Sequence, residues 1–396
     1  MGEVAHAGEA AAADYRDPGP FEVVAHGNRL RFYPAGEDRL AALLALIDSA
    51  SHSLRLCFYI FAEDRCGKAV RDALVAAARR GVRVQVMIDG FGSGRTRAGF
   101  FAGLCEAGGE FCCFSARWNV RYLIRNHQKI VVADADRALI GGFNVEADYF
   151  APPSANGWND LAIEVSGPAV ARLVEWYDRL HGWTIDPQAQ WRAMRRLIRE
   201  WDPGSGPVQW LIGGPIRGLS PWARSVSDDL RAGTRLDMMM AYFSPARVLL
   251  GRIARIARQG QTRLLLAAKS DNGATIGASR LLYGPLLKRG ARIWEFAPCK
   301  LHAKLIVLDD AVYLGSANFD MRSLYINVEI MLRIEDAALA ERMREYVAAH
   351  LPASQPITRE LHRRRLTPFN RIRWALSWLL VSVIDYTVTR RLNLGL

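Results

Sequence analysis

Two segments of this chain, far apart in the sequence, are built alike. The first reads NHQKIVVADADRALIGGFN over residues 126–144, and the second reads LHAKLIVLDDAVYLGSAN over residues 301–318. Each opens with a histidine and a lysine two positions apart, continues as an apolar stretch, and ends in small residues and an asparagine. Similar strand and helix signals precede both copies in the same order. A repeat of this size predicts two similar α/β halves rather than a solenoid of short units.

The elements expected in the two halves correspond to one another. In the first half the sequence predicts helices at 40–50 and 68–80 and strands at 54–61, 82–89 and 110–114. In the second half it predicts strands at 236–243, 263–272 and 291–296 and helices at 246–258 and 279–288.

Composition and turn signals divide the chain into four regions. We expect a flexible N-terminal tail at 1–20, a first domain at 21–203, a second domain at 204–350 and a basic amphipathic tail at 351–396. The segment DPGSGP at 202–207 marks the seam between the halves. The first 20 residues are rich in Ala and Gly, are acidic and lack an apolar run, so we expect no signal peptide there.

The charge and the cysteines narrow the function classes. The 396-residue chain has a formal net charge of +12, which favours an anionic partner such as nucleic acid, a membrane surface or a phosphate-bearing substrate. Its 6 cysteines are scattered and form no CxxC pair, so a reduced, cytosolic setting is expected rather than a disulfide framework. Only 6 of the 52 basic residues are lysines, and 2 of these 6 lie in the repeated motif.

Both copies of the motif have the pattern HxKxxxxD. Its members are His127, Lys129 and Asp134 in the first copy and His302, Lys304 and Asp309 in the second. Residues i and i+2 of a strand point to the same face, so each histidine projects together with its lysine. The aspartates have a second interpretation as turn residues at strand ends.

If the two halves pack so that the motifs meet, they form one cationic, donor-rich site. Two lysines and the amides of Asn144 and Asn318 suit a phosphoryl group whose charge grows in the transition state. One imidazole can attack phosphorus, and the other can protonate the leaving oxygen and later deprotonate the acceptor. We expect no metal and no cofactor, because the lysines supply the positive charge. Taken singly, each histidine or lysine would more often be structural or solvated; the duplication argues against that.

The paired HxKxxxxD motifs, each followed by G-G/S-x-N, resemble the phospholipase D superfamily over about residues 22–350. Segments such as FYIFAED at 58–64, WNDLAIEVSGPAV at 158–170 and GSANFDMRSLYINVE at 315–329 are similar to bacterial cardiolipin synthases, particularly short ones without N-terminal transmembrane helices. The resemblance implies two α/β/α halves from an internal duplication, with the active site at their interface, and a phosphatidyltransferase activity.

The resemblance also implies roles for individual residues. His127 would form a phosphatidyl-histidine intermediate, and His302 would act as acid and base. Phosphate would be bound by the lysines and asparagines named above, and Asp134 and Asp309 would support the motif. Three further carboxylates are candidates for orienting the opposing imidazoles or, alternatively, for surface or fold-stabilising roles: Glu146, Asp160 and Glu329.

The two motifs differ at one position. Gly142 in the first copy corresponds to Ser316 in the second. A hydroxyl contact is therefore available from one side only, and we expect the two halves to be chemically unequal.

The C-terminal tail bears on the substrate. Residues 359–396 contain eight arginines and two acids, a net charge of +6. The apolar stretch at 374–389 has 16 residues, fewer than the roughly 20 that span a bilayer. We expect an interfacial helix on an anionic membrane surface; the alternative is a helix packed on the second domain.

The sequence thus favours transfer of a phosphatidyl group between phosphatidylglycerol molecules, giving cardiolipin and glycerol, by a peripheral enzyme on the cytoplasmic side of the bacterial inner membrane. Phospholipid hydrolysis is the alternative, and a nuclease is less favoured, so nucleic acid is not the expected partner. The acceptor and the oligomeric state stay open.

Overall fold

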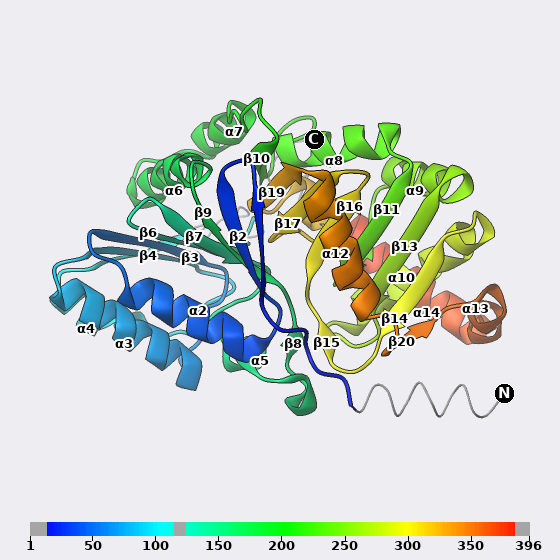
Figure 1. Ribbon diagram of the computed structural model, residues 1–396, viewed down its shortest axis with the longest axis horizontal. Coiled ribbons are helices and arrows are strands. Elements are labelled where there is room, and N and C mark those ends of the chain that lie inside the picture. The colour runs from blue at the N-terminus through cyan, green and yellow to red at the C-terminus, as the bar shows by residue number, and fades with distance from the viewer. Residues whose placement is uncertain (1–13, 115–123, 385–396) are drawn as a thin grey trace.

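Two eight-stranded sheets, which share a common order over seven strands, lie side by side in the computed structural model, which describes residues 14–114 and 124–384 (Figure 1). The first has the order β1-β2-β9-β7-β6-β3-β4-β5, and the second β10-β19-β17-β16-β11-β13-β14-β20. The seven strands from β2 to β5 correspond one by one to the seven from β10 to β14, and β1 and β20 are additional edge strands. The internal duplication and the mixed α/β fold class are therefore confirmed.

The strands of the first sheet are short and mostly buried. They are β1 (Phe21–Ala25), β2 (Asn28–Tyr33), β3 (Ser53–Phe58), β4 (Arg83–Asp89), β5 (Glu110–Phe114), β6 (Ile130–Ala133), β7 (Arg137–Gly141) and β9 (Ala162–Ser166). In the second sheet they are β10 (Val208–Gly213), β11 (Arg235–Met240), β13 (Gln261–Ala267), β14 (Arg292–Phe296), β16 (Lys304–Leu308), β17 (Ala311–Gly315), β19 (Glu329–Glu335) and β20 (Ser354–Pro356). In each sheet three parallel strands (β3, β4, β5 and β11, β13, β14) adjoin an antiparallel hairpin that starts at a motif.

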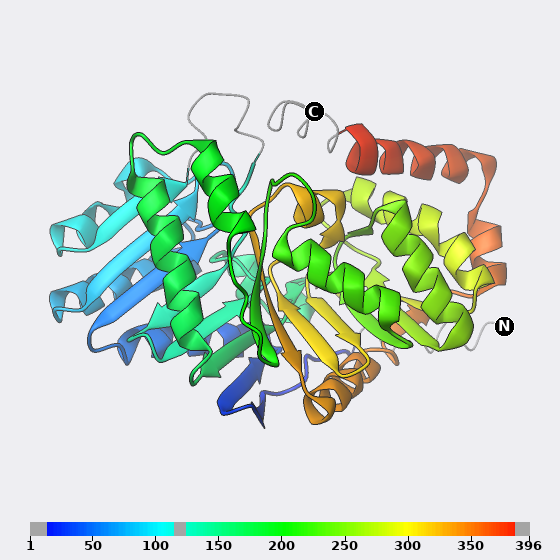
Figure 2. The ribbon, with the colours of Figure 1, turned by 90° about the horizontal axis from the view of Figure 1, so that it is seen from above.

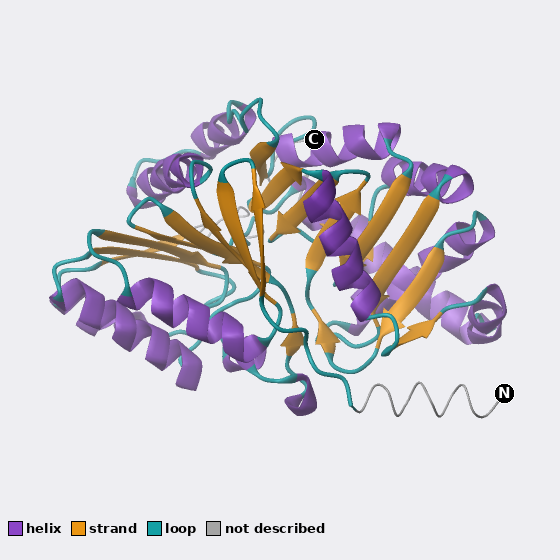
Figure 3. Cartoon of the chain, in the orientation of Figure 1, coloured by secondary structure: helices purple, strands orange, loops and turns teal. Residues whose placement is uncertain are grey.

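Helices cover both faces of each sheet (Figure 3). In the first half they are α2 (Gly36–Asp48), α3 (Arg65–Arg79), α4 (Ala102–Glu106), α5 (Ala147–Phe150), α6 (Val170–Ile185) and α7 (Trp191–Arg199). In the second half they are α8 (Pro221–Ala232), α9 (Arg247–Gln259), α10 (Gly273–Lys288), α11 (Met321–Tyr325), α12 (Ala337–Ala349), α13 (Arg359–Arg365) and α14 (Pro368–Trp378), which continues as the π-helical segment η4 (Leu379–Ile384).

Local sequence explains how these helices begin and which face they bury. In α3 the side chain of Asp64 accepts a hydrogen bond from the backbone N–H of Gly67 and caps the first turn. Val70 and Leu74, one turn apart, are fully buried against the first sheet. The helix ends just before Gly81, whose φ of +89° is the left-handed conformation that glycine tolerates.

One apolar core is shared by the two halves. It contains Trp176 of α6, Ile212 of β10, Leu305 of β16 and Met343 of α12, all fully buried. Two separate cores lie on the outer sides, under α2 and α3 in the first half and under α8 to α10 in the second. A continuous core between the sheets fixes their relative position, as a site built from both halves requires.

Two very short strand pairs also connect elements distant in sequence. β8 (Trp158–Asn159) of the first half pairs in parallel with β15 (Lys300–Leu301) of the second half, and both lie near the centre of Figure 1. Within the second half, β12 (Phe243–Ser244) pairs with β18 (Phe319–Asp320).

The ends of the chain are more integrated than the sequence predicts. Tyr15, inside the expected flexible tail, packs its ring 5.0 Å from that of Phe296 and accepts a hydrogen bond from Asn159. The second sheet continues past residue 350, because β20 adds a last strand beside β14. The rest of both predicted tails, residues 1–13 and 385–396, lies outside the described residues.

The C-terminal segment packs on the second domain through one face. Trp374 of α14 is 2% exposed and stacks on His362, with ring centroids 5.8 Å apart. Figure 2 shows α14, in red, lying along the edge of the molecule beside α10. The Trp374 side of α14 is therefore packed on the domain, while Phe369, Ile372 and Leu376 are exposed on its other side. Among the described residues, no helix is long and apolar enough to cross a membrane.

Candidate active site

The two motif histidines lie just before β6 and β16. The backbone N–H of each one donates a hydrogen bond to a backbone carbonyl of the other half. The N–H of His127 donates to the carbonyl of Val328 at 2.9 Å, and the N–H of His302 donates to the carbonyl of Asn159 at 2.7 Å. The residue after each acceptor is a carboxylate, Glu329 in the first case and Asp160 in the second. The two halves thus exchange equivalent hydrogen bonds at the centre of the molecule.

Each imidazole is oriented by the carboxylate of the opposite half. His127 Nδ1 lies 3.1 Å from Glu329 Oε2, and His302 Nδ1 lies 2.7 Å from Asp160 Oδ2. A carboxylate at Nδ1 favours the tautomer with the proton on that nitrogen and leaves Nε2 as the reactive atom. Both carboxylates are fully buried, so their position is fixed.

The lysines are buried beside their own histidines, with exposures of 1% for Lys129 and 0% for Lys304. Lys129 Nζ donates to the carbonyl of His127 at 2.6 Å. Lys304 Nζ donates to the carbonyl of His302 and lies 2.9 Å from its Nδ1. Each lysine therefore lies beside its own histidine, although His127, Lys129 and His302 precede the strands β6 and β16 rather than belonging to them.

Position 142 and position 316 differ because the two carboxylates differ in length. Ser316 donates its hydroxyl to Glu329 Oε2. A Cβ placed on Gly142 would lie 2.7 and 2.8 Å from the two carboxylate oxygens of Asp160. The shorter aspartate therefore occupies the space that a side chain at 142 would need.

A cavity of about 460 Å³ opens onto both histidines. Asn144 and Asn318 lie in its wall, one from each half. Asn144 Oδ1 accepts the N–H of Ile60 at 3.1 Å, so the NH₂ group of this amide does not bond Ile60. Asn318 Oδ1 is buried without a hydrogen-bond partner. The part of the chain described here holds no group of three or more His, Cys, Asp or Glu side chains arranged for a metal ion.

Burial sets the protonation of the four motif bases. It lowers the pKa of His127 to about 4 and that of His302 to about 3, although the partner carboxylates oppose the shift. It lowers the pKa of Lys129 to about 7 and that of Lys304 to about 8. Both imidazoles are therefore neutral at pH 7, as a nucleophile requires.

The carboxylates stay ionised in spite of their burial. Burial disfavours the charge of Glu329, but His127, Lys129 and Ser316 together hold its pKa below the ordinary value. Burial acts on Asp160 in the same way and is outweighed by His302 and Lys304. A phosphodiester anion entering the cavity would favour protonation of an imidazole, which supplies the acid that a leaving oxygen needs.

The structure does not bring Asp134 and Asp309 to the reacting groups. They follow β6 and β16 at the opposite end from the lysines, in turns with φ of +50° and +48°. Asp134 accepts the backbone N–H groups of residues 51–53 at 2.7–2.9 Å, and Asp309 those of Thr234 and Arg235. These contacts agree with the second interpretation given above, that of turn residues at strand ends.

Glu146 is also away from the imidazoles. It precedes α5 and is half-buried, and burial followed by the nearby Asp148 and Asp64 raises its pKa. Of the three candidate carboxylates, only Asp160 and Glu329 contact histidines.

Aromatic rings pack around both histidines, and sequence reasoning did not single them out. Tyr59 lies 4.9 Å from His127 between ring centroids, and Tyr149 and Trp158 each lie 5.0 Å from His302. Arg125, Arg322, Leu380 and Val381 also line the cavity. Tyr59 lies within the strand predicted at 54–61, and Arg125 lies two residues before His127, but nothing local indicates that η4 reaches the site.

The chain is similar to known proteins. A family model described as "Cardiolipin synthase, PLD-like domain", where PLD denotes phospholipase D, matches residues 43–181 and 230–351. These two matched segments contain all the histidines, lysines and carboxylates of the site.

The chain belongs to this family.

Among curated relatives, the major cardiolipin synthase ClsA of Bacillus subtilis is 30% identical over 370 residues, which cover 88% of this chain and 74% of the relative. Cardiolipin synthase A of Pseudomonas entomophila is 29% identical over 343 residues, covering 84% and 70%. This family member is thus related to cardiolipin synthases along most of its length.

Solved structures show the fold. Phosphatidylserine synthase from Haemophilus influenzae matches with a TM-score of 0.69 at 16% identity and covers 94% of this chain and 95% of its own. Polyphosphate kinase from Porphyromonas gingivalis matches with a TM-score of 0.56 at 15% identity, covering 84% and 49%. Because the same fold carries both names, the fold alone does not select a substrate.

Proposed function

We propose that this family member transfers a phosphatidyl group from one phosphatidylglycerol to the headgroup hydroxyl of another, releasing glycerol and forming cardiolipin. One observation carries the proposal: two imidazoles, each with Nδ1 held by a buried carboxylate, border one cavity, and a buried lysine lies beside each histidine. Such a pair can divide phosphodiester exchange into two displacements at phosphorus.

In the first displacement, Nε2 of His127 attacks phosphorus and the bond from phosphorus to the glycerol oxygen breaks. His302 gives a proton to that oxygen, and glycerol leaves. In the second, the hydroxyl of another phosphatidylglycerol gives its proton to His302 and its oxygen attacks phosphorus, so the phosphorus–nitrogen bond breaks. Each imidazole returns to its starting state.

Lys129 and Lys304 support this reaction as fixed charges for the phosphoryl oxygens, which gain charge in the transition state. Asn144 and Asn318 supply amide donors from the two sides of the same cavity. Glu329 and Asp160 stabilise the imidazolium forms that arise in alternate steps.

We further propose that the protein binds peripherally to an anionic membrane surface, on the cytoplasmic side of the bacterial inner membrane. Opposite Trp374, the C-terminal helix exposes an apolar stripe with Phe369 at 73%, Ile372 at 63% and Leu376 at 54% exposure. Exposed arginines, Arg371 and Arg373, flank the stripe. An apolar face bordered by cations suits a phospholipid surface.

The product profile tests the proposal. Purified protein is supplied with phosphatidylglycerol in mixed micelles, and the lipids and released glycerol are followed by mass spectrometry. Cardiolipin and glycerol should appear in a ratio near one to one, and His127→Ala and His302→Ala should each abolish both. Phosphatidic acid as the product would establish hydrolysis instead. Absence of lipid turnover together with cleavage of DNA would contradict the lipid assignment.

A further inference from the structure

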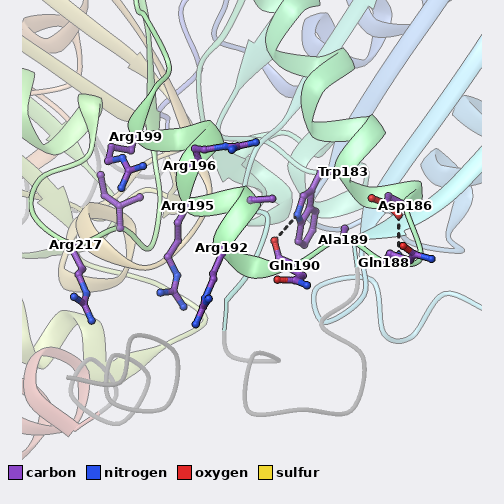
Figure 4. Close-up of a pocket in the computed structure, with 12 residues that line it drawn as sticks. Trp183, Asp186, Gln188, Ala189, Gln190, Arg192, Arg195, Arg196, Arg199 and Arg217 are labelled. Atoms are coloured by element: carbon purple, nitrogen blue, oxygen red, sulfur yellow. Dashed lines mark hydrogen bonds between the residues drawn. The ribbon is translucent and has the colours of Figure 1, made fainter.

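A second hollow, of about 630 Å³, lies beside α7 and shares no lining residue with the catalytic cavity. Five arginines line it, four from α7 and one from the segment after β10 (Figure 4). They are Arg192, Arg195, Arg196, Arg199 and Arg217. Neither the proposed reaction nor the fold described above uses them.

The arginines occupy the outer face of a helix that is anchored by its other face. Trp191, Met194 and Ile198 of α7 are buried in the central core at helical spacing. Arg192, Arg196 and Arg199 are exposed, and Arg195 is half-buried. The apolar residues thus fix the helix, and the guanidinium groups are presented at the surface.

In the part of the chain that the structure describes, few acidic side chains lie beside Arg192, Arg196, Arg199 and Arg217. Glu200 lies 4.0 Å from Arg196 and 3.4 Å from Arg199, and these exposed pairs contribute little. Asp186 is the one acid among the described residues of the lining, and its carboxylate accepts the backbone N–H of Gln188 at 2.8 Å. Within the residues that the structure describes, Arg192 and Arg217 form no ion pair. The hollow is therefore a concentrated positive site.

The hollow faces the same side of the molecule as the C-terminal helix. Figure 2 shows α7 and α14 along one edge, and in Figure 4 the side chains of Arg192, Arg195 and Arg217 extend in one direction from their backbones. Leu380 and Val381, which continue from α14, line the catalytic cavity. One side of the protein thus carries an arginine hollow, an apolar stripe and a wall of the active site.

We propose that this hollow binds the phosphate of an anionic phospholipid in the bilayer, as an anchor distinct from the catalytic site. Guanidinium groups bind phosphate oxygens in bidentate pairs, and several together favour a group with more than one free oxygen. The partly exposed Trp183 in the lining and the exposed Ile185 nearby suit the interfacial depth at which a lipid phosphate lies. The anchor and the stripe of α14 then orient the catalytic cavity toward the membrane. This inference rests on the proposed action at a lipid surface.

Vesicle binding of a triple variant, Arg192→Gln with Arg195→Gln and Arg217→Gln, tests the anchor. The matched control removes three exposed arginines from other elements: Arg79→Gln, Arg83→Gln and Arg258→Gln. Cosedimentation is measured with vesicles of phosphatidylcholine containing phosphatidylglycerol and with vesicles of phosphatidylcholine alone. The hollow variant should bind the anionic vesicles about tenfold or more weakly than wild type, since each basic residue near the surface contributes to attraction. The control should change by less than about twofold, and binding to neutral vesicles should be the same for all three proteins.

Two further measurements separate this inference from the proposed function. Cardiolipin formation in detergent micelles should be unchanged in the hollow variant, because the catalytic cavity is intact, and its thermal unfolding should match that of wild type. Equal binding of anionic vesicles by wild type and the hollow variant would overturn the anchor while leaving the transferase proposal standing. Equal losses in both triple variants would reduce the effect to net charge and would also overturn it. Loss of binding to inorganic phosphate or duplex DNA, with vesicle binding unchanged, would assign the hollow to that ligand instead.

Discussion

At the scale of single residues, the two motifs differ in the carboxylate that orients the histidine. It is a glutamate for His127 and an aspartate, shorter by one methylene group, for His302. Glu329 is longer than Asp160, and it reaches His127 while accepting the hydroxyl of Ser316. Asp160 reaches His302 from a shorter stem, and its carboxylate fills the space above Gly142. The glycine therefore follows from steric contact with the carboxylate that orients the opposite histidine.

Gly142→Ala should lower kcat by about 100-fold with a small change in KM, because a displaced carboxylate misplaces His302 by a fraction of an ångström or more. The new Cβ would lie 2.7 Å from Asp160 Oδ1, which is closer than a real Cβ allows. Ser316→Ala, the control, removes one hydrogen bond without a clash and should lower kcat less than tenfold. Steady-state kinetics in mixed micelles measures both, and full activity of Gly142→Ala would contradict the assigned contact.

The lysines predict how substrate binding depends on pH. An ammonium group is charged below its pKa. Burial lowers the pKa of Lys129 to about 7 and that of Lys304 to about 8. Affinity for a phosphodiester such as glycerophosphoglycerol, whose own charge is constant over this range, should be high at pH 6 and fall as the pH rises through 7 and 8. Isothermal titration at several pH values measures this. Lys129→Met should show weaker binding with a smaller dependence on pH, and an affinity that rises with pH would exclude the lysines as the phosphate-binding charges.

At the scale of elements, the motif aspartates hold the hairpins that carry the histidines and lysines. Asp134 links the β6–β7 turn to the start of β3, and Asp309 links the β16–β17 turn to the start of β11. Both turns require a positive φ, which aspartate tolerates better than most residues. The last residue of each HxKxxxxD pattern is therefore explained by strand registration rather than by chemistry.

Asp134→Ala should lower the free energy of unfolding by about 1–2 kcal/mol, since it leaves three backbone N–H groups without their charged acceptor. Urea unfolding measures this change. Activity per folded molecule should stay within about threefold of wild type. A loss of activity as large as that of His302→Ala, at unchanged stability, would show that the aspartate acts in catalysis.

At the scale of the whole molecule, the site exists only where the two halves meet. Backbone hydrogen bonds from His127 to Val328 and from His302 to Asn159 join the sheets, and the β8–β15 pair extends the second contact. Nearby, the buried His350 contacts both Asn159 and Tyr15. The seam between the halves therefore contains three neutral histidines, of which His302 and His350 are buried and His127 is mostly buried.

This seam should make the protein sensitive to acid. Burial lowers the pKa of His127, His302 and His350 to about 4, 3 and 4, whereas an unfolded histidine titrates near 6.5. Between these values the unfolded state binds more protons, so stability falls as pH decreases from about 6.5 toward 4, by up to about 1.4 kcal/mol per pH unit for each histidine. Urea unfolding between pH 7 and 5 measures the slope. His350→Gln, outside the active site, should reduce it, and a slope of the opposite sign would contradict the buried, neutral state.

The sequence predicted most of the local structure and fewer of the contacts between the two halves. The HxK spacing indicated that each lysine lies beside its histidine, because residues two apart in an extended chain point to the same side. Asp160 and Glu329 were suggested through resemblance, but Glu146 looked equally suitable until the halves were brought together. The two-residue strand β8, the packing of Tyr15 and the approach of Leu380 to the cavity have no local signal, because each depends on contacts between distant segments.

We propose that both halves form one site, in which His127 attacks phosphorus and His302 transfers the proton. The most direct test is to mix His302→Ala with phosphatidylglycerol, quench with base, and analyse peptides by mass spectrometry. Leaving-group departure is slowed but not abolished without the acid, while transfer to the acceptor lacks its base, so a phosphatidyl adduct should accumulate on the peptide containing His127. It should be absent from His127→Ala. An adduct on His302 in the His127→Ala protein would reverse the two roles, and the absence of any adduct, with cardiolipin still formed by wild type, would contradict the covalent mechanism.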